Sequence, residues 1–267
     1  TGEFSCSDPL INQLQRNIVW GQKGNFIDIP TDCPQRDERL GWTGDAQVFA
    51  PTAAFNMDVA AFFTKWQQDL ADAQHDNGRI PPIAPDTRFG HADGGPAWAD
   101  AVVIVPWTMY QRYGDVRLLE RHFPAMRAWM AYLAETSPGH IRAHPDGAPR
   151  QGYGDWLALD GSGGTEGATP KDLIGTAYYA HSARLMARIA EALGRDVDKK
   201  RYARLFEAIR KAFIRRFVTG EGLLSGQTQT ALALALRFDL LPAAARPRAL
   251  AELARDIAAR GNHLSTG

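Results

Sequence analysis

The sequence has little of what defines several large classes of protein. Its 267 residues include two cysteines, Cys6 and Cys33, too few for a disulfide framework or a four-thiolate zinc site. The formal net charge is zero, which argues against a nucleic-acid partner, since such binding needs a basic face. Apolar runs such as residues 231–236 are far shorter than the ~20 residues of a membrane span, so no membrane partner is expected.

The start of the sequence shows no charged segment followed by an apolar stretch. We therefore expect no targeting peptide, and no compartment is indicated. The length allows one large domain or two small ones and is sufficient for a substantial core; we expect one domain over residues 1–267. Its partner is expected to be neutral or small and polar.

Apolar residues recur with the period of a helix, and strand-like alternation is nowhere comparably strong. The clearest stripe is Val116, Leu119, Phe123, Met126, Met130 and Leu133, and a second is Tyr178, His181, Leu185, Ile189 and Leu193. The pattern predicts an all-α chain. Its helices are expected at about 7–22, 44–56, 58–77, 99–113, 115–136, 171–193, 196–218, 227–238 and 246–260.

Two kinds of connection separate these helices. At residues 113–115 and 193–196, a glycine follows one helix and an aspartate, Asp115 or Asp196, is expected to cap the next. The segments at about 23–43, 78–98 and 137–170 are long and rich in Gly, Pro and Asp, and long loops in compact domains are usually functional. Helix pairs with short turns on one side and long loops on the other indicate a helical toroid with its site on the long-loop face.

Each long segment combines carboxylates with a tryptophan, namely Trp42, Trp98 or Trp156. Flat aromatic rings contact the C–H faces of sugars, and charged groups bind sugar hydroxyls. Glycoside cleavage also needs two carboxyl groups. A single loop aspartate or tryptophan is more often a cap or a structural plug, but the combination in all three segments favours a carbohydrate site.

Residues 32–45, DCPQRDERLGWTGD, closely resemble the signature of the α-L-rhamnosidases of glycoside hydrolase family 78. PAWADA at 96–101, GYGDWL at 152–157 and GNHLSTG at 261–267 resemble that family in the same order. The resemblance implies a six-hairpin (α/α)₆ toroid and an inverting hydrolase that releases terminal α-L-rhamnose. Its substrate would be a flavonoid glycoside or a polysaccharide oligomer, and we expect neither a cofactor nor a metal.

The same resemblance assigns site residues. It places the general acid on Glu38, which must hold its proton; neighbouring carboxylates favour this and a contacting arginine opposes it. We expect Arg36 to contact Asp32 or sugar hydroxyls and Arg39 to hold the loop, while Cys33 is a buried shaping residue. The sugar-contacting residues are expected to be Asp32, Arg36, Trp42, Asp45, Trp98, Asp155 and Trp156.

The general base of the family is a glutamate in a Trp-Glu context well after the segment that resembles residues 261–267. We therefore expect the base beyond Gly267, although Glu166 and Asp155 are the carboxylates of this chain that could be proposed for it. Nine predicted helices give an incomplete ring of about four to five hairpins, which need not be active alone. Accessory β-domains are expected elsewhere in the parent chain.

Two other functions stay open: another six-hairpin glycosidase, α-L-fucosidase-like or glucosidase-like, and a non-catalytic sugar-binding fragment. Calcium is disfavoured because residues 93–95 and 155–161 lack the spacing of an EF-hand. His181 is expected in the core. The remaining histidines considered as ligands, His75, His91 and His144, have no partners at zinc spacing.

Overall fold

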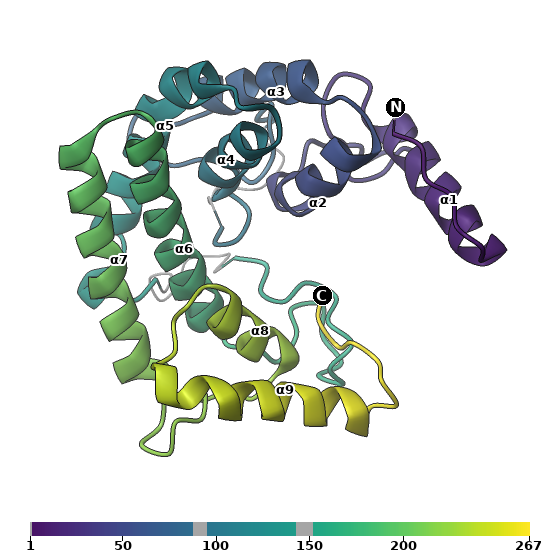
Figure 1. The fold of residues 1–267 in the computed structure, drawn as a ribbon. Helices are drawn as coiled ribbons and strands as arrows, with labels where there is room; N and C mark the ends of the chain where they lie inside the picture. The colour runs from purple at the N-terminus through teal and green to yellow at the C-terminus, as the bar shows by residue number, and fades with distance from the viewer. Residues whose placement is uncertain (1, 88–94, 143–151) are drawn as a thin grey trace. The chain divides into compact units, whose positions relative to one another are not determined.

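The computed structural model describes residues 2–87, 95–142 and 152–267. In these ranges the regular structure is helical, with isolated bridge pairs but no strand, so the predicted all-α class is confirmed (Figure 1). No helix in this part of the chain is long and apolar enough to cross a membrane. His91, Asp93 and His144 lie outside the described residues.

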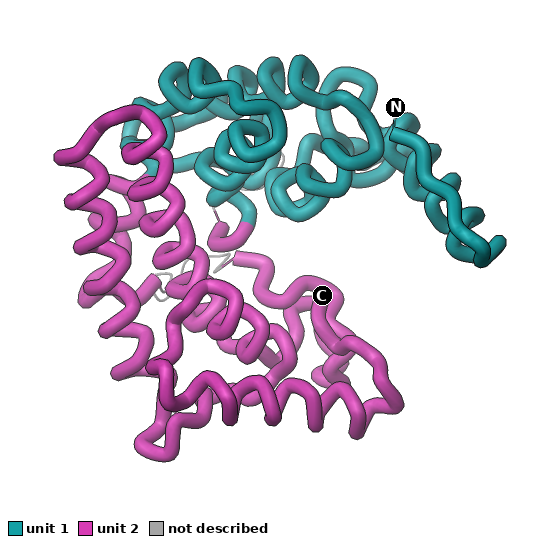
Figure 2. Tube along the Cα trace, viewed as in Figure 1, with its two compact units in different colours: residues 1–94, 98–129 teal, residues 95–97, 130–267 magenta. Residues whose placement is uncertain are grey.

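The chain divides into two compact units, and the boundary falls inside one helix, between Trp129 and Met130 (Figure 2). The first unit comprises residues 1–94 and 98–129. Its α2 and α3 both pack against α4, and Phe63, Trp66 and Phe123 are among its fully buried side chains. Its helices are α1 (Pro9–Asn25), α2 (Thr43–Asn56), α3 (Ala60–Asp72), α4 (Ala101–Tyr113) and the start of α5 (Val116–Glu135).

The second unit comprises residues 95–97 and 130–267. Helices α6 and α7 pack along each other, and α8 contacts both α6 and α9 (Figure 1). Tyr179, Met186 and Phe213 are among its fully buried side chains. Besides the end of α5, it holds α6 (Lys171–Ala192), α7 (Asp196–Phe217), α8 (Gln229–Arg237), α9 (Arg246–Ala259) and the 3₁₀ helices η1 (Pro138–His140) and η2 (Ala243–Ala245).

Of the two short turns, the one before α5 has the predicted aspartate cap and the one before α7 does not. Gly114 ends α4 with a φ of 70°, and the Asp115 carboxylate accepts from the backbone N–H groups of Arg117 and Leu118. Asp196 is not the cap of α7, contrary to the prediction, because Arg195 occupies the N-cap position, where its side chain makes no capping hydrogen bond. Asp196 instead lies in the first turn, where the helix dipole favours a negative charge.

The predicted apolar stripes hold at most positions, and the departures include Val116, Tyr178 and His181. Val116, expected in the core, is 40% exposed at the first turn of α5. Helix α6 is buried on more than one face, so Tyr178 and His181 lie at the edge of the buried surface rather than at its centre. His181 nevertheless stacks on Phe238, with ring centroids 4.0 Å apart.

Candidate active site

The loop between α1 and α2 is held at both ends. At its start, the Thr31 hydroxyl donates to the backbone and side-chain oxygens of Asn25. At its end, the backbone N–H and hydroxyl of Thr43 both donate to the carbonyl of Pro82, and Ala84 N donates to Gly41 O at 2.9 Å. A Cβ at Gly41 would collide with the Ala84 carbonyl, so this pairing requires glycine.

Within the loop, the backbone turns back on itself between Asp32 and Leu40. Asp32 N donates to Leu40 O at 3.1 Å, and Leu40 N donates to the Asp32 carboxylate at 3.0 Å. Arg39 takes up the reversal with a φ of 48°, in the left-handed region. This closure brings the side chain of Glu38 beside that of Asp32.

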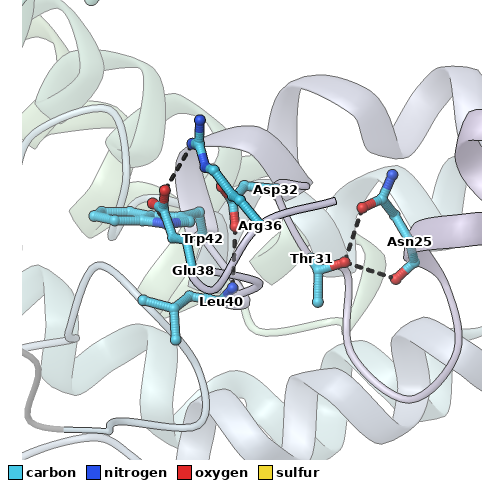
Figure 3. A network of polar contacts seen from close by, with 7 residues as sticks. All are labelled: Asn25, Thr31, Asp32, Arg36, Glu38, Leu40 and Trp42. Atoms are coloured by element: carbon cyan, nitrogen blue, oxygen red, sulfur yellow. Dashed lines mark hydrogen bonds and ion pairs between the residues drawn. The ribbon is translucent and has the colours of Figure 1, made fainter. Parts of the chain in front are cut away.

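Glu38 lies at the centre of a polar network (Figure 3). Its Oε1 accepts a hydrogen bond of 2.9 Å from the indole Nε1 of Trp42, and its Oε2 lies 2.6 Å from Arg36 Nη2. The same Arg36 nitrogen is 3.5 Å from Asp32 Oδ2. The side chains of Asp32, Glu38 and Arg36 are 9%, 30% and 60% exposed, so the carboxylates lie beneath a guanidinium that faces solvent.

Arg36 fulfils one expectation and adds a contact that the sequence did not indicate. It pairs with Asp32, as the sequence suggested, but it also contacts Glu38. The hydrogen bond to Glu38 is the main cause that raises the pKa of Arg36 above its ordinary value. Arg39 instead lies 4.0 Å from Asp37, on the exposed side of the loop. One arginine of the motif therefore contacts the candidate acid, and the other pairs with its exposed neighbour.

Asp45 and Trp98 are positioned by the first turn of α2. The pKa of Asp45 is raised, first because the surrounding chain desolvates its carboxyl, although the residue as a whole is exposed, and then because Asp32 and Glu38 repel its charge. The indole of Trp98 lies directly on Gly44: a Cβ there would be 2.6 Å from its Cε2 and Nε1 atoms. Six of the eight expected site residues thus belong to the first unit.

Asp155 and Trp156 belong to the second unit. Asp155 is buried, and its carboxylate accepts from the hydroxyls of Thr169 and Thr230 and from Gly267 N. These bonds hold three distant segments of the unit together, whereas the predicted sugar contact stays a prediction. Trp156 is 42% exposed and meets Tyr153 edge-on, with ring centroids 6.0 Å apart.

Cys33 is buried, as expected, but its surroundings were not foreseen. Its sulfur lies in a cluster with the carboxylates of Asp32 and Glu38, in which one ligand atom from each residue lies within 4.8 Å of the others. The closeness of Cys33 to Glu38 depends on the chain reversal at Arg39, which leaves no periodic signal in the sequence.

Comparison with known proteins agrees with this architecture. The family profile described as the bacterial alpha-L-rhamnosidase 6 hairpin glycosidase domain matches residues 1–267. An alpha-L-rhamnosidase of Streptomyces avermitilis is 48% identical over 268 residues, covering all of this chain and 24% of its own length. One from Formosa agariphila is 44% identical over 269 residues and is covered over 28% of its length. The chain thus spans about a quarter of the length of these relatives.

Solved structures give the same result for the fold. The crystal structure of Streptomyces avermitilis alpha-L-rhamnosidase complexed with L-rhamnose has a TM-score of 0.90 at 47% identity, over 99% of this chain and 24% of that chain. The alpha-L-rhamnosidase from Dictyoglumus thermophilum has a TM-score of 0.91 at 37% identity, over 100% and 29%. The chain therefore belongs to the bacterial α-L-rhamnosidase family of six-hairpin glycosidase domains.

Proposed function

We propose that the protein containing this chain hydrolyses terminal α-L-rhamnosides with inversion, and that Glu38 is its general acid. The observation that carries the assignment is the position of Glu38, held between the indole of Trp42 and the guanidinium of Arg36. Family membership and a relative solved with L-rhamnose support the choice of sugar. The sugar-facing residues proposed with Glu38 are Asp32, Arg36, Trp42, Asp45, Trp98, Asp155 and Trp156.

A general acid must carry a proton at the moment when the glycosidic oxygen departs. The contact between Arg36 and Glu38 favours the ionised carboxyl instead. Arg36 is 60% exposed and its side chain is long, so sugar hydroxyls can compete for its guanidinium. We propose that bound rhamnose draws Arg36 away from Glu38, which leaves the neighbouring Asp32 carboxylate to favour the protonated acid.

The general base is proposed to lie on a segment that follows Gly267 in the parent chain, as the resemblance implies. The structure supports no assignment within the described residues. Asp155 uses both carboxylate oxygens in internal hydrogen bonds. Glu166 is engaged by Lys171 Nζ at 2.6 Å. An inverting pair needs carboxyl groups roughly 6.5–9.5 Å apart, with room for water between them.

The assignment is tested by the substitution Glu38→Gln in the full-length protein. The new amide would keep an oxygen that accepts from Trp42 but would have no acidic proton to give, so turnover of a rhamnosyl disaccharide should fall by orders of magnitude. The matched control is Asp37→Asn, because Asp37 is the adjacent carboxylate and is fully exposed. Near-normal turnover of the disaccharide by Glu38→Gln would show that Glu38 is not the acid.

The sugar specificity needs its own measurement, because other six-hairpin glycosidases share the fold. A panel of aryl α-L-rhamnoside, α-L-fucoside and glucoside substrates should show activity on the rhamnoside alone. Activity on the fucoside or the glucoside instead would replace the proposed substrate but leave the acid assignment standing. Binding of rhamnose by calorimetry without turnover of any substrate would favour a sugar-binding protein.

A further inference from the structure

We infer that Asp32, Cys33 and Glu38 form a binding site for a thiophilic divalent cation such as Zn²⁺. One ligand atom from each of the three lies within 4.8 Å of the others. The donor set, one thiol and two carboxylates, is not an acidic cluster of the kind that exposed loops commonly carry. Three protein ligands that leave a fourth position for water are a recurrent arrangement for zinc.

The buried thiol is the independent observation that points to a ligand. Cys33 is only 6% exposed and unoxidised, and no hydrogen bond to its sulfur is present among the described residues. Its sulfur nevertheless lies within 4.8 Å of a carboxylate oxygen of Asp32 and of one of Glu38. A bound metal would deprotonate this thiol and take it as a ligand.

The distances require only a small contraction. Zn–S bonds of about 2.3 Å and Zn–O bonds of about 2.1 Å put the ligand atoms of a tetrahedral site roughly 3.4–3.6 Å apart. The three ligand atoms, which now lie up to 4.8 Å apart, would therefore move about 1 Å closer together. Asp32 and Glu38 belong to a loop whose ends are fixed by hydrogen bonds, so side-chain rotation supplies this movement.

Arg36 now supplies the positive charge beside the two carboxylates that a bound metal would supply. Its guanidinium bridges the carboxylates of Asp32 and Glu38, and its side chain is 60% exposed; Figure 3 shows the contact with Glu38. A divalent cation would displace it outward, and the Cys33 proton would pass to solvent. Because Glu38 would become a metal ligand, the cation would inhibit hydrolysis; this consequence rests on the proposed function, whereas the binding itself does not.

Cobalt(II) is the probe, because a cobalt–thiolate bond gives a charge-transfer absorption that carboxylates do not give. Titrating the full-length protein with Co²⁺ should produce this band. Cys33→Ser should abolish the band, or its Cys33-dependent part if other thiols of the parent chain also bind. Cys6→Ser removes the other, exposed cysteine and is the matched control, which should keep the band. Far-UV circular dichroism confirms that the variants stay helical.

A second variant acts in the opposite direction and guards against a folding defect. Arg36→Met removes the competing guanidinium, so Co²⁺ and Zn²⁺ should bind at least about tenfold more tightly. No band in the wild-type protein, a band that survives unchanged in Cys33→Ser, or weaker metal binding by Arg36→Met would overturn the site. If the band behaves as stated but Zn²⁺ leaves turnover unchanged, the metal site stands and the acid role of Glu38 fails.

Discussion

Gly44 gives a quantitative test of how the loop positions Trp98. The residue lies in the first turn of α2, and a Cβ built on it would approach three indole atoms of Trp98 at 2.6–2.8 Å. Normal carbon contacts are about 3.5–4.0 Å, so Gly44→Ala would displace the indole by roughly 1 Å. Overpacking of this kind costs about 1–3 kcal/mol.

The opposing term is the helix propensity of alanine. Gly→Ala within a helix stabilises it by about 0.5–1 kcal/mol, and less in the first turn. We therefore expect Gly44→Ala to lower the free energy of unfolding by about 0–2.5 kcal/mol and to weaken rhamnose binding through the displaced Trp98.

The control is Gly21→Ala in α1, where a Cβ would meet nothing within 4 Å. This variant should gain about 0.5–1 kcal/mol. Urea denaturation gives both values, and tryptophan fluorescence with calorimetric titration of rhamnose reports on Trp98. Equal stabilisation by the two substitutions, with unchanged rhamnose binding by Gly44→Ala, would refute the claim that the indole of Trp98 needs glycine at position 44.

Three further predictions concern single residues. Burial, the main cause, and nearby arginines lower the pKa of His181 from 6.5 to about 3, so the unfolded chain binds the proton more readily between these pH values. The free energy of unfolding should therefore fall as the pH drops through this window, by up to about 1.4 kcal/mol per pH unit. A series of thermal melts over this pH range should show a shallower fall for His181→Phe. Trp42→Ala should weaken rhamnose binding while far-UV helicity is retained, and a collapse of helicity would show that Trp42 is a structural plug. Asp155→Ala should lower the stability by about 2–4 kcal/mol in denaturant titration, because the hydroxyls of Thr169 and Thr230 lose their buried partner, and a change below about 0.5 kcal/mol would contradict that role.

The helices were predictable because apolar periodicity and glycine turns are local properties. The predicted 171–193 and 196–218 differ by one residue from α6 and α7, joined through Gly194 in the left-handed region. The prediction that Asp196 caps α7 was wrong because an aspartate at the cap and one in the first turn look alike in sequence. The prediction that Val116 is buried was wrong because an apolar stripe does not show where the neighbouring helices stop covering it.

The sequence indicated which residues of the loop to consider but not their contacts, and the roles proposed for these residues stay predictions. The motif at residues 32–45 indicated Asp32, Arg36, Glu38 and Trp42, and the structure brings them into one network. The pairing of Arg36 with Glu38 and the approach of Cys33 both follow from the chain reversal at Arg39. Such a reversal is set by the two hydrogen bonds between Asp32 and Leu40, which no periodicity or propensity reports.

The central claim is that Glu38 donates the proton to the leaving group, and the dependence of rate on that group tests it most directly. An activated aryl rhamnoside needs little protonation, whereas a rhamnosyl disaccharide needs it fully. Turnover by Glu38→Gln should therefore fall by orders of magnitude more on the disaccharide than on the activated rhamnoside. An equal loss on both substrates would contradict the account, because Glu38 would then bind or position the sugar rather than protonate the departing oxygen.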